Sequence, residues 1–217
     1  MSIVGIDEAG RGPVIGPLVI AGVIVEKEKR KELEEWFKNL GVKDSKKILP
    51  VRRERIYEEL IQKVKYSVKV ITPEEIDHTL LNTNSNLNWL EADYSIEIIN
   101  ELNAKEAILD CPSTNPQKYS EYVQIKTPKI RLIVEHKADD TYLLVGAASI
   151  IAKVTRDKLI ENIKKEIKID FGSGYPSDPK TQEFLKKNYN KFNIFRKSWS
   201  SYQKIISKKE QLNLKKF

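Results

Sequence analysis

Two apolar runs rich in β-branched residues lie near the start of the chain. Residues 3–6 and the run L-V-I-A-G-V-I-V at 18–25 have the length and composition of buried strands. The short connection through Gly16 and Pro17 favours an antiparallel hairpin between them. Further strands are expected at residues 66–71, 107–109 and 130–134. The pattern therefore predicts five strands.

Helices are predicted wherever apolar residues recur at helical spacing. The expected helices span residues 27–40, 50–64, 73–81, 87–102 and 143–167, followed by helical pieces within 180–217. Gly41 occupies a C-cap position, Thr72 to Glu75 form a capping box, and Ser177 or Asp178 is expected to cap a helix that starts at Pro179. Strands that alternate with helices indicate an α/β protein.

The composition narrows the class of protein. The chain has 217 residues, of which 40% are hydrophobic and 32% charged, and no stretch approaches the roughly twenty apolar residues that span a bilayer. Because the first residues enter a strand at once, we expect no signal peptide, no membrane contact and a cytoplasmic location. Cys111 is the only cysteine, so intramolecular disulfides and thiol-rich metal sites are excluded. Any metal must be held by oxygen or histidine.

The charge balance favours a polyanionic partner. Lys and Arg number 38 against 31 Asp and Glu, a net charge of +7, and much of the excess lies in the last third of the chain. Basic proteins are predisposed to bind nucleic acid. A lysine-rich surface also serves solubility alone, so charge supports this interpretation without deciding it.

Asp7 and Glu8 are expected to end the first strand. Adjacent side chains on a regular strand point to opposite faces, so we expect the backbone to turn here if both carboxylates serve one site. Gly10 and Gly12 permit such a turn and a close approach to a ligand. The alternative is an acidic surface turn without chemistry. The segment has neither P-loop nor dinucleotide-binding spacing.

Acidic residues follow three of the predicted strands: Asp7 with Glu8, Asp110, and Asp139. Carboxylates at neighbouring strand ends of an α/β sheet converge on one crevice. Several unpaired carboxylates in one place remain ionised only if cations lie between them. Oxygen ligands select Mg²⁺ or Mn²⁺, and two such ions about 3.5 to 4 Å apart suit hydrolysis of phosphodiesters.

Six ordered motifs resemble those of type 2 ribonuclease H, ribonuclease HII, in its archaeal-like single-chain form. They are D-E-A-G-R-G at 7–12, G-V-K-D-S-K-K at 41–47, A-I-L-D at 107–110, H-K-A-D at 136–139, A-A-S-I-I-A-K-V-T-R-D at 147–157 and G-S-G-Y-P-S-D-P at 172–179. The resemblance covers nearly the whole chain. It implies a ribonuclease H-like fold, in which a five-stranded mixed sheet flanked by helices and a C-terminal helical lobe form a groove for duplex nucleic acid.

The resemblance also implies roles for the acids. Asp7, Glu8, Asp110 and Asp139 are its metal-binding catalytic residues, with two Mg²⁺ or Mn²⁺ ions present during catalysis. The H-K-A-D motif assigns the fourth role to Asp139, whereas the sequence alone allows Asp140 equally. His136 is left out of the site, because water activated by metal needs no histidine base. Cys111 is expected to be a small buried residue.

Substrate contacts are implied by the same motifs. Gly10, Arg11 and Gly12 would recognise the ribonucleotide, whose 2′-hydroxyl offers a donor and an acceptor to backbone groups. Tyr175 would stack on the adjoining deoxyribose, although without the resemblance a core aromatic is the simpler interpretation. Lys46, beside Ser45, would hold a phosphate.

The predicted function is an endoribonuclease that cuts the RNA strand of RNA/DNA hybrids and ribonucleotides embedded in DNA, leaving 3′-hydroxyl and 5′-phosphate ends. We expect a role in ribonucleotide removal during DNA replication and repair. One alternative is type 3 ribonuclease H, which shares the opening motif but has an extra N-terminal domain. Another is a binding module without activity, which would gain nothing from a negatively charged pocket.

Three regions are expected in a monomer: a catalytic domain at 1–170, a helical substrate-binding lobe at 171–210, and a tail at 211–217. In this tail Gln211, Leu214 and Phe217 follow the spacing i, i+3, i+6, which places the leucine and phenylalanine on one apolar face of a helical turn. The tail resembles the peptide by which replication and repair enzymes bind the sliding clamp, without its usual second aromatic. The alternative is a frayed basic tail.

Overall fold

The computed structural model describes residues 1–42 and 48–214. Its strands are β1 (Ser2–Ala9), β2 (Leu18–Glu26), β3 (Lys65–Ile71), β4 (Glu106–Asp110) and β5 (Arg131–Glu135). Its α-helices are α1 (Arg30–Leu40), α2 (Pro50–Lys63), α3 (Pro73–Asn82), α4 (Leu87–Glu101), α5 (Pro116–Lys126), α6 (Ala138–Thr141), α7 (Leu143–Ile167), α8 (Pro179–Asn188) and α9 (Ser200–Leu214), with the short 3₁₀ helix η1 (Lys27–Lys29) before α1.

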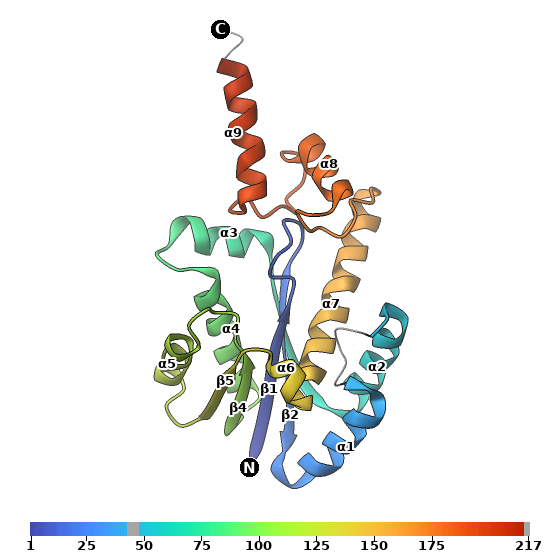
Figure 1. Ribbon diagram of the computed structural model, residues 1–217, viewed down its shortest axis with the longest axis vertical. Helices are drawn as coiled ribbons and strands as arrows, with labels where there is room; N and C mark the ends of the chain where they lie inside the picture. Colours follow the sequence, from blue (N-terminus) through green and yellow to red (C-terminus); the bar gives the residue numbers. More distant parts are fainter. Residues whose placement is uncertain (43–47, 215–217) are drawn as a thin grey trace. The chain divides into compact units, whose positions relative to one another are not determined.

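The described strands form one mixed sheet in the order β3-β2-β1-β4-β5. Strand β1 pairs antiparallel with β2 and parallel with β4, and β4 pairs parallel with β5 (Figure 1). Parallel neighbours require a crossover. The long connection from β2 to β4, which contains α1 to α4 and β3, returns the chain to the other side of β1, and α5 connects β4 to β5. The predicted five-stranded mixed sheet and the hairpin of the first two strands are confirmed.

The chain divides into two compact units. Unit 1 comprises Met1–Ala9, Val19–Val70 and Asn88–Arg156. Unit 2 comprises Gly10–Leu18, Ile71–Leu87 and the chain from Asp157 onward. The C-terminal helices thus share a unit with two segments from earlier in the sequence. The functional division expected at residue 170 stays a prediction.

Two glycines set the packing of unit 1. A Cβ atom at Gly5 would lie 2.6 Å from the carbonyl carbon of Leu144 on α7, and one at Gly22 would lie 2.4 Å from Cγ2 of Ile98 on α4. Gly5 pairs with Val23 across the hairpin, so Gly22, one residue away, faces the opposite side of the sheet. Helices α7 and α4 therefore cover opposite faces of the hairpin.

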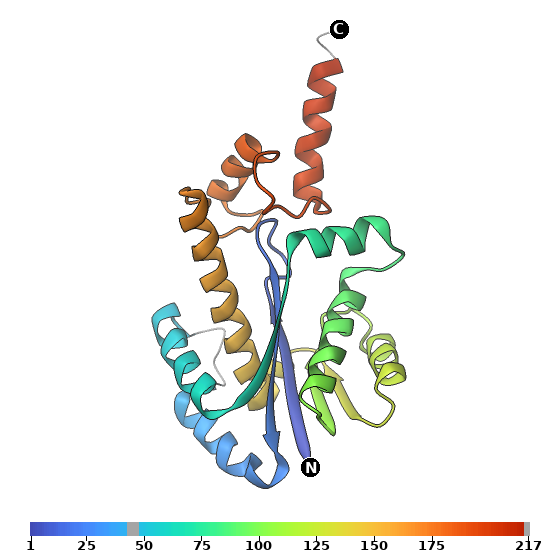
Figure 2. The same ribbon diagram turned by 180° about the vertical axis from the view of Figure 1, so that it is seen from behind.

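Several local signals are confirmed. Gly41 ends α1 in the left-handed region at φ 85°, and Thr72 and Glu75 form the reciprocal capping box of α3. In Figures 1 and 2, α1 lies beside α2, and Lys63 Nζ on α2 lies 4.4 Å from the Trp36 ring centroid on α1. Helix α5 was not predicted, because its apolar residues show little helical periodicity. Asn115 caps this helix by accepting a hydrogen bond from the Lys118 N–H.

Unit 2 has an aromatic core of its own. Phe184 lies at its centre, with ring centroids 5.5 Å from Phe171 and 5.7 Å from Phe195. Val14 and Tyr202 belong to the same buried cluster. No helix in the part of the chain that the structure describes is long and apolar enough to cross a membrane.

Candidate active site

The backbone does not turn at Asp7 and Glu8, contrary to the prediction. Strand β1 continues through them, with Glu8 paired to Ile20 and Ala9 paired to Val19 on β2. The longer neighbouring strand extends the hydrogen-bonded ladder, and the chain leaves the strand only after Ala9. The two carboxylates therefore belong to opposite faces of the sheet.

Asp7, Glu8 and Asp110 nevertheless converge. Each offers a carboxylate oxygen, and these three atoms lie within 4.8 Å of one another. The parallel pairing between β1 and β4 ends at Ile6 and Leu109, so this edge of β1 is not paired with β4 beyond that point. The side chains of Asp7 and Glu8, from opposite faces of β1, therefore both approach Asp110 at the end of β4. The predicted convergence of these three carboxylates is present, but it does not require a backbone turn at Asp7 and Glu8.

Each face of the sheet gives its carboxylate a different environment. Asp7 shares a face with Gly5 and so meets α7, where the hydroxyl of the fully buried Ser149 hydrogen-bonds to it. Glu8 lies on the other face and acts electrostatically on Tyr119 of α5. Burial, with the nearby charges of Glu91 and Glu8, raises the pKa of Tyr119 well above its ordinary value.

Asp7 is buried, and burial perturbs its pKa. Its side chain is 5% exposed, and its Oδ1 accepts a hydrogen bond of 2.8 Å from the Glu8 N–H. Its pKa is raised from 3.8 to about 6, mainly by burial and in part by the charge of Asp110, while Ser149 and Lys153 oppose the rise. Burial thus outweighs the hydrogen bond and the positive charge, and Asp7 holds its negative charge at a cost.

Asp110 and Asp139 are linked through the start of α6. Oδ1 of Asp110 accepts a hydrogen bond of 2.7 Å from the Ala138 N–H, and Asp139 follows in the same turn. Asp139 is 2% exposed and Asp140 is exposed. Among the described residues, the close carboxylate group contains Asp7, Glu8 and Asp110, and the role of Asp139 stays a prediction. His136 Nδ1 lies 3.1 Å from the Cys111 carbonyl oxygen, the structural contact expected of a residue outside the site.

Ser149 and Lys153 were not assigned a role from the sequence. They stand one turn apart on α7, and Lys153 Nζ donates a hydrogen bond to Ser149 Oγ. The S-x-x-x-K spacing inside the 147–157 motif was the available signal, because residues four apart share a helix face. The spacing indicates a role in the site only if β1 packs against that face of α7, which the sequence does not show.

The residues expected to recognise a ribonucleotide come together in unit 2. A Cβ atom at Gly12 would lie 3.3 Å from Tyr175 Cε1, so the tyrosine ring covers the glycine. Gly10 has a φ of 93°, and Arg11 follows it. Tyr175 is 40% exposed, which excludes a core aromatic.

The loop that carries Tyr175 is held by Asp178. This carboxylate accepts hydrogen bonds from the Ser173 N–H, the Ser173 hydroxyl and the Lys180 N–H. The bonds from Ser173 are the main reason why its pKa falls to about 2. Of the two predicted caps of α8, Asp178 is therefore the correct one. Val14 N–H donates to the Gly174 carbonyl at 2.9 Å, which joins this loop to the segment after Gly12.

Three predicted contacts concern side chains outside the described residues. These are Ser45 and Lys46 of the expected phosphate contact, and Phe217 of the tail. Leu214 is the last residue of α9, but its side chain is likewise outside the description. Gln211 lies on α9 and is exposed.

Comparisons with known proteins agree over most of the chain. The family model described as Ribonuclease HII matches residues 4–202. Ribonuclease HII of Pyrococcus furiosus is 41% identical over 229 residues, covering 100% of this chain and 98% of the relative. The curated relative thus corresponds to this chain from end to end.

Solved structures give the same assignment. The crystal structure of ribonuclease H2 from Pyrococcus horikoshii OT3 has a TM-score of 0.84 at 38% identity, covering 96% of this chain and 98% of that one. RNase HII in the PCNA:RNase HII complex from Archaeoglobus fulgidus has a TM-score of 0.82 at 40% identity, covering 92% and 96%. With its ribonuclease H fold and its converging carboxylates, this chain belongs to the ribonuclease HII family.

Proposed function

We propose that the chain cuts the RNA strand of RNA/DNA hybrids, and single ribonucleotides embedded in DNA, leaving 3′-hydroxyl and 5′-phosphate ends. Family membership supports endonuclease action on the RNA of hybrids. The observation that carries the proposal is the convergence of Asp7, Glu8 and Asp110. The expected biological role is removal of ribonucleotides during DNA replication and repair.

The carboxylate cluster fits a divalent metal site. Its donor atoms are all oxygens, the ligands that suit Mg²⁺ or Mn²⁺. The raised pKa of Asp7 means that negative charge is costly here, a cost that a bound cation offsets. Asp7, Glu8 and Asp110 would hold the ions, with Asp139 as the proposed fourth ligand. When bound, two ions supply activation of the attacking water and stabilisation of the leaving 3′ oxygen.

The remaining residues position the cluster and the substrate. Ser149 orients Asp7 by a hydrogen bond, and Lys153 in turn holds Ser149. In unit 2, the backbone from Gly10 to Gly12 would contact the ribose, and the partly exposed Tyr175 would stack on the next sugar. Lys46 and Ser45 remain the proposed phosphate contact.

The test is cleavage of a DNA duplex that contains one ribonucleotide. The protein should cut it with Mg²⁺ or Mn²⁺ and not with EDTA, and should leave the all-DNA duplex intact. Asp110→Asn should abolish cutting, because it removes a ligand and one negative charge. Asp93→Asn is the matched control, since Asp93 is an acid of the same unit that binds Lys126 on the surface. Cleavage of the ribonucleotide duplex in EDTA would refute the metal-dependent mechanism.

We further propose that the tail at 211–217 binds the sliding clamp. The PCNA:RNase HII complex of Archaeoglobus fulgidus shows a relative in complex with PCNA, and the Q-x-x-L-x-x-F spacing supports the same partner here. The leucine and phenylalanine would enter an apolar groove on the clamp, as anchors at helical spacing do.

Truncation separates the tail from catalysis. Deletion of residues 211–217 should abolish binding to a clamp from the same organism while leaving the cleavage of free duplexes unchanged. Replacement of Lys215 and Lys216 by alanine is the control, because it removes two charges and keeps the Q-x-x-L-x-x-F residues. Equal loss of binding in both variants would mean that charge alone attracts the clamp.

A further inference from the structure

One buried arginine holds the loop that follows β1. Arg196 is 0% exposed, although it comes 186 residues after Gly10. Its Nη2 donates to the Gly10 carbonyl at 2.7 Å, its Nη1 to the Arg11 carbonyl at 3.1 Å, and its Nε to the Gly16 carbonyl at 2.9 Å. A single guanidinium therefore binds both ends of the loop.

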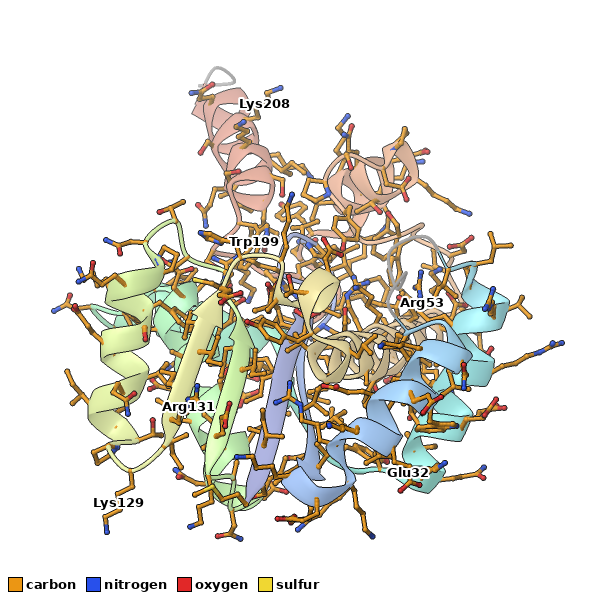
Figure 3. All side chains as sticks on the ribbon, turned by 60° about the horizontal axis from the view of Figure 1, so that its bottom comes forward. Glu32, Arg53, Lys129, Arg131, Trp199 and Lys208 are labelled. Atoms are coloured by element: carbon orange, nitrogen blue, oxygen red, sulfur yellow. The ribbon has the colours of Figure 1, made fainter. Side chains whose placement is uncertain are left out.

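Trp199 adds a fourth hydrogen bond. Its Nε1–H donates to the Gly12 carbonyl at 3.1 Å, so the carbonyls of three consecutive residues are bound by side chains. The guanidinium carbon of Arg196 lies 4.7 Å from the centroid of the Trp199 ring, a cation–π distance. Trp199 is labelled in Figure 3, directly before α9. The two side chains form one support.

The support is itself fixed from another element. Asp77 on α3 is 9% exposed and accepts hydrogen bonds from the Lys197 N–H at 2.7 Å, the Ser198 N–H at 2.8 Å and the Ser198 hydroxyl at 2.6 Å. Lys197 and Ser198 are the two residues between Arg196 and Trp199. A buried carboxylate thus holds the backbone from which both donors project.

Backbone contacts already join these segments. The Arg196 N–H donates to the Val14 carbonyl at 2.8 Å, and Ile15 forms a β-bridge with Phe195. The side chains of Arg196 and Trp199 are therefore not required to bring the segments together. What they add is the orientation of the peptide groups at Gly10, Arg11 and Gly12.

That orientation determines where the donors of the loop point. In a trans peptide the C=O and the following N–H are antiparallel, and the chain has no cis peptide among its described residues. Because the carbonyls of Gly10 and Arg11 point to Arg196, the N–H groups of Arg11 and Gly12 point away from it. Gly12 is exposed and lies against Tyr175, so this side of the loop is where a sugar would bind.

We infer that Arg196 and Trp199 are positioning residues for ribose recognition: Arg196 holds the amides of Arg11 and Gly12 toward the 2′-hydroxyl, and Trp199 fixes the Gly12 carbonyl beside them. The inference rests on the proposed function of the Gly10–Gly12 loop. Arg196 is fully buried, so it acts only through the loop. The Gly12 carbonyl precedes Pro13, which has no N–H, so Trp199 acts by fixing the backbone on the C-terminal side of Gly12. Without this donor Gly12 is free to shift, and the loop loses its distinction between a ribose and a deoxyribose while the carboxylate cluster is unchanged.

The test compares Trp199→Phe with Tyr202→Phe. The first keeps an aromatic ring and removes the donor to Gly12. The second removes the hydrogen bond of 3.1 Å from the Tyr202 hydroxyl to the Tyr189 carbonyl, which also lies in unit 2 but does not involve Gly10, Arg11 or Gly12. Both are made in an Asp7→Asn background that binds without cutting. Affinity is measured for a duplex with one ribonucleotide and for the all-DNA duplex of the same sequence.

Trp199→Phe should lower the ratio of the two affinities by about three- to tenfold, the usual effect of one lost hydrogen bond. Tyr202→Phe should leave the ratio unchanged, even if it lowers the melting temperature as much. Arg196→Lys, which keeps the charge without the three-way fork, should lower the ratio at least as far as Trp199→Phe.

Two results would overturn the inference: an unchanged ratio in Trp199→Phe, or the same change in Tyr202→Phe. The proposed function fails separately, if the protein with Asp7 intact does not cut the duplex with one ribonucleotide in Mg²⁺ or Mn²⁺. Equal affinity of the Asp7→Asn parent for both duplexes would overturn ribose recognition by the loop and the inference together.

Discussion

Gly5 of β1 lies against the backbone of Leu144, where an added Cβ atom would approach the carbonyl carbon to 2.6 Å. This contact seats the first turn of α7 on β1, two residues before Asp7. Ser149 lies further along the same helix and hydrogen-bonds to Asp7. A position that carries no side chain therefore helps to align the site.

Gly5→Ala should destabilise the protein by about 2 kcal/mol, because overpacking against fixed backbone typically costs 1 to 3 kcal/mol. Gly22→Ala on the paired strand is the control. Its new methyl would meet Cγ2 of Ile98, a side-chain atom and not backbone, so the loss should be smaller. Urea unfolding measures the free energy of unfolding of both variants. A larger loss of stability in Gly22→Ala than in Gly5→Ala would contradict this account of the packing.

Asp7→Asn should abolish cleavage and leave duplex binding nearly intact, because it removes a metal ligand and one negative charge. Loss of comparable electrostatic stabilisation costs about a hundredfold or more in rate. Turnover and affinity are measured separately. A variant that retains more than about a hundredth of the rate would place Asp7 outside the metal site.

The same substitution should stabilise the metal-free protein at neutral pH. The pKa of Asp7 is raised from 3.8 to about 6, so between these values the folded chain binds more protons than the unfolded chain, and the free energy of unfolding falls as pH rises. Asparagine does not titrate. In EDTA at pH 7.5 the gain should approach about 3 kcal/mol, at 1.36 kcal/mol per pKa unit, and should vanish at pH 3.

Melting temperatures with and without Mg²⁺ check this result. Added Mg²⁺ should raise the melting temperature of the parent protein more than that of Asp7→Asn, because the cation offsets the buried charge only where the charge exists. An equal rise in both proteins would show that the ion binds elsewhere.

Asp139→Asn and Asp140→Asn form a matched pair on one turn of α6. Asp139 is 2% exposed and follows the residue that donates to Asp110, whereas Asp140 is exposed. We expect Asp139→Asn to lower the rate by at least about a hundredfold, as loss of a ligand does, and Asp140→Asn to change it little. The reverse pattern would assign the fourth acid to Asp140.

Tyr175→Ala should reduce the preference for an RNA-to-DNA junction more than it reduces activity on a uniform hybrid. Stacking on a base contributes about 1 to 3 kcal/mol, and stacking on a sugar should lie near 1 kcal/mol, or about fivefold. Tyr175→Phe keeps the ring over Gly12 and should retain the preference. If both substrates suffered equally in Tyr175→Ala, the tyrosine would only shape its loop.

The sequence by itself determined the elements and the chemistry. Strand and helix periods, the capping box at Thr72 and the C-cap at Gly41 are local features, and short-range sterics and hydrogen bonds suffice to specify them. The acids of the candidate site were likewise visible, because each follows an apolar run that ends in a carboxylate. Helix α5 was not predicted because, apart from its cap at Asn115, the segment has little amphipathic pattern.

Tertiary structure alone decided how these parts meet. Asp7 and Glu8 reach one place without a turn, at the edge of β1 that is not paired with β4, which depends on where β4 ends. Arg196 binds Gly10 across 186 residues, a separation over which local periodicity carries no information. Such contacts form only when distant elements pack together. A buried polar group must then hydrogen-bond to a group that the fold places next to it.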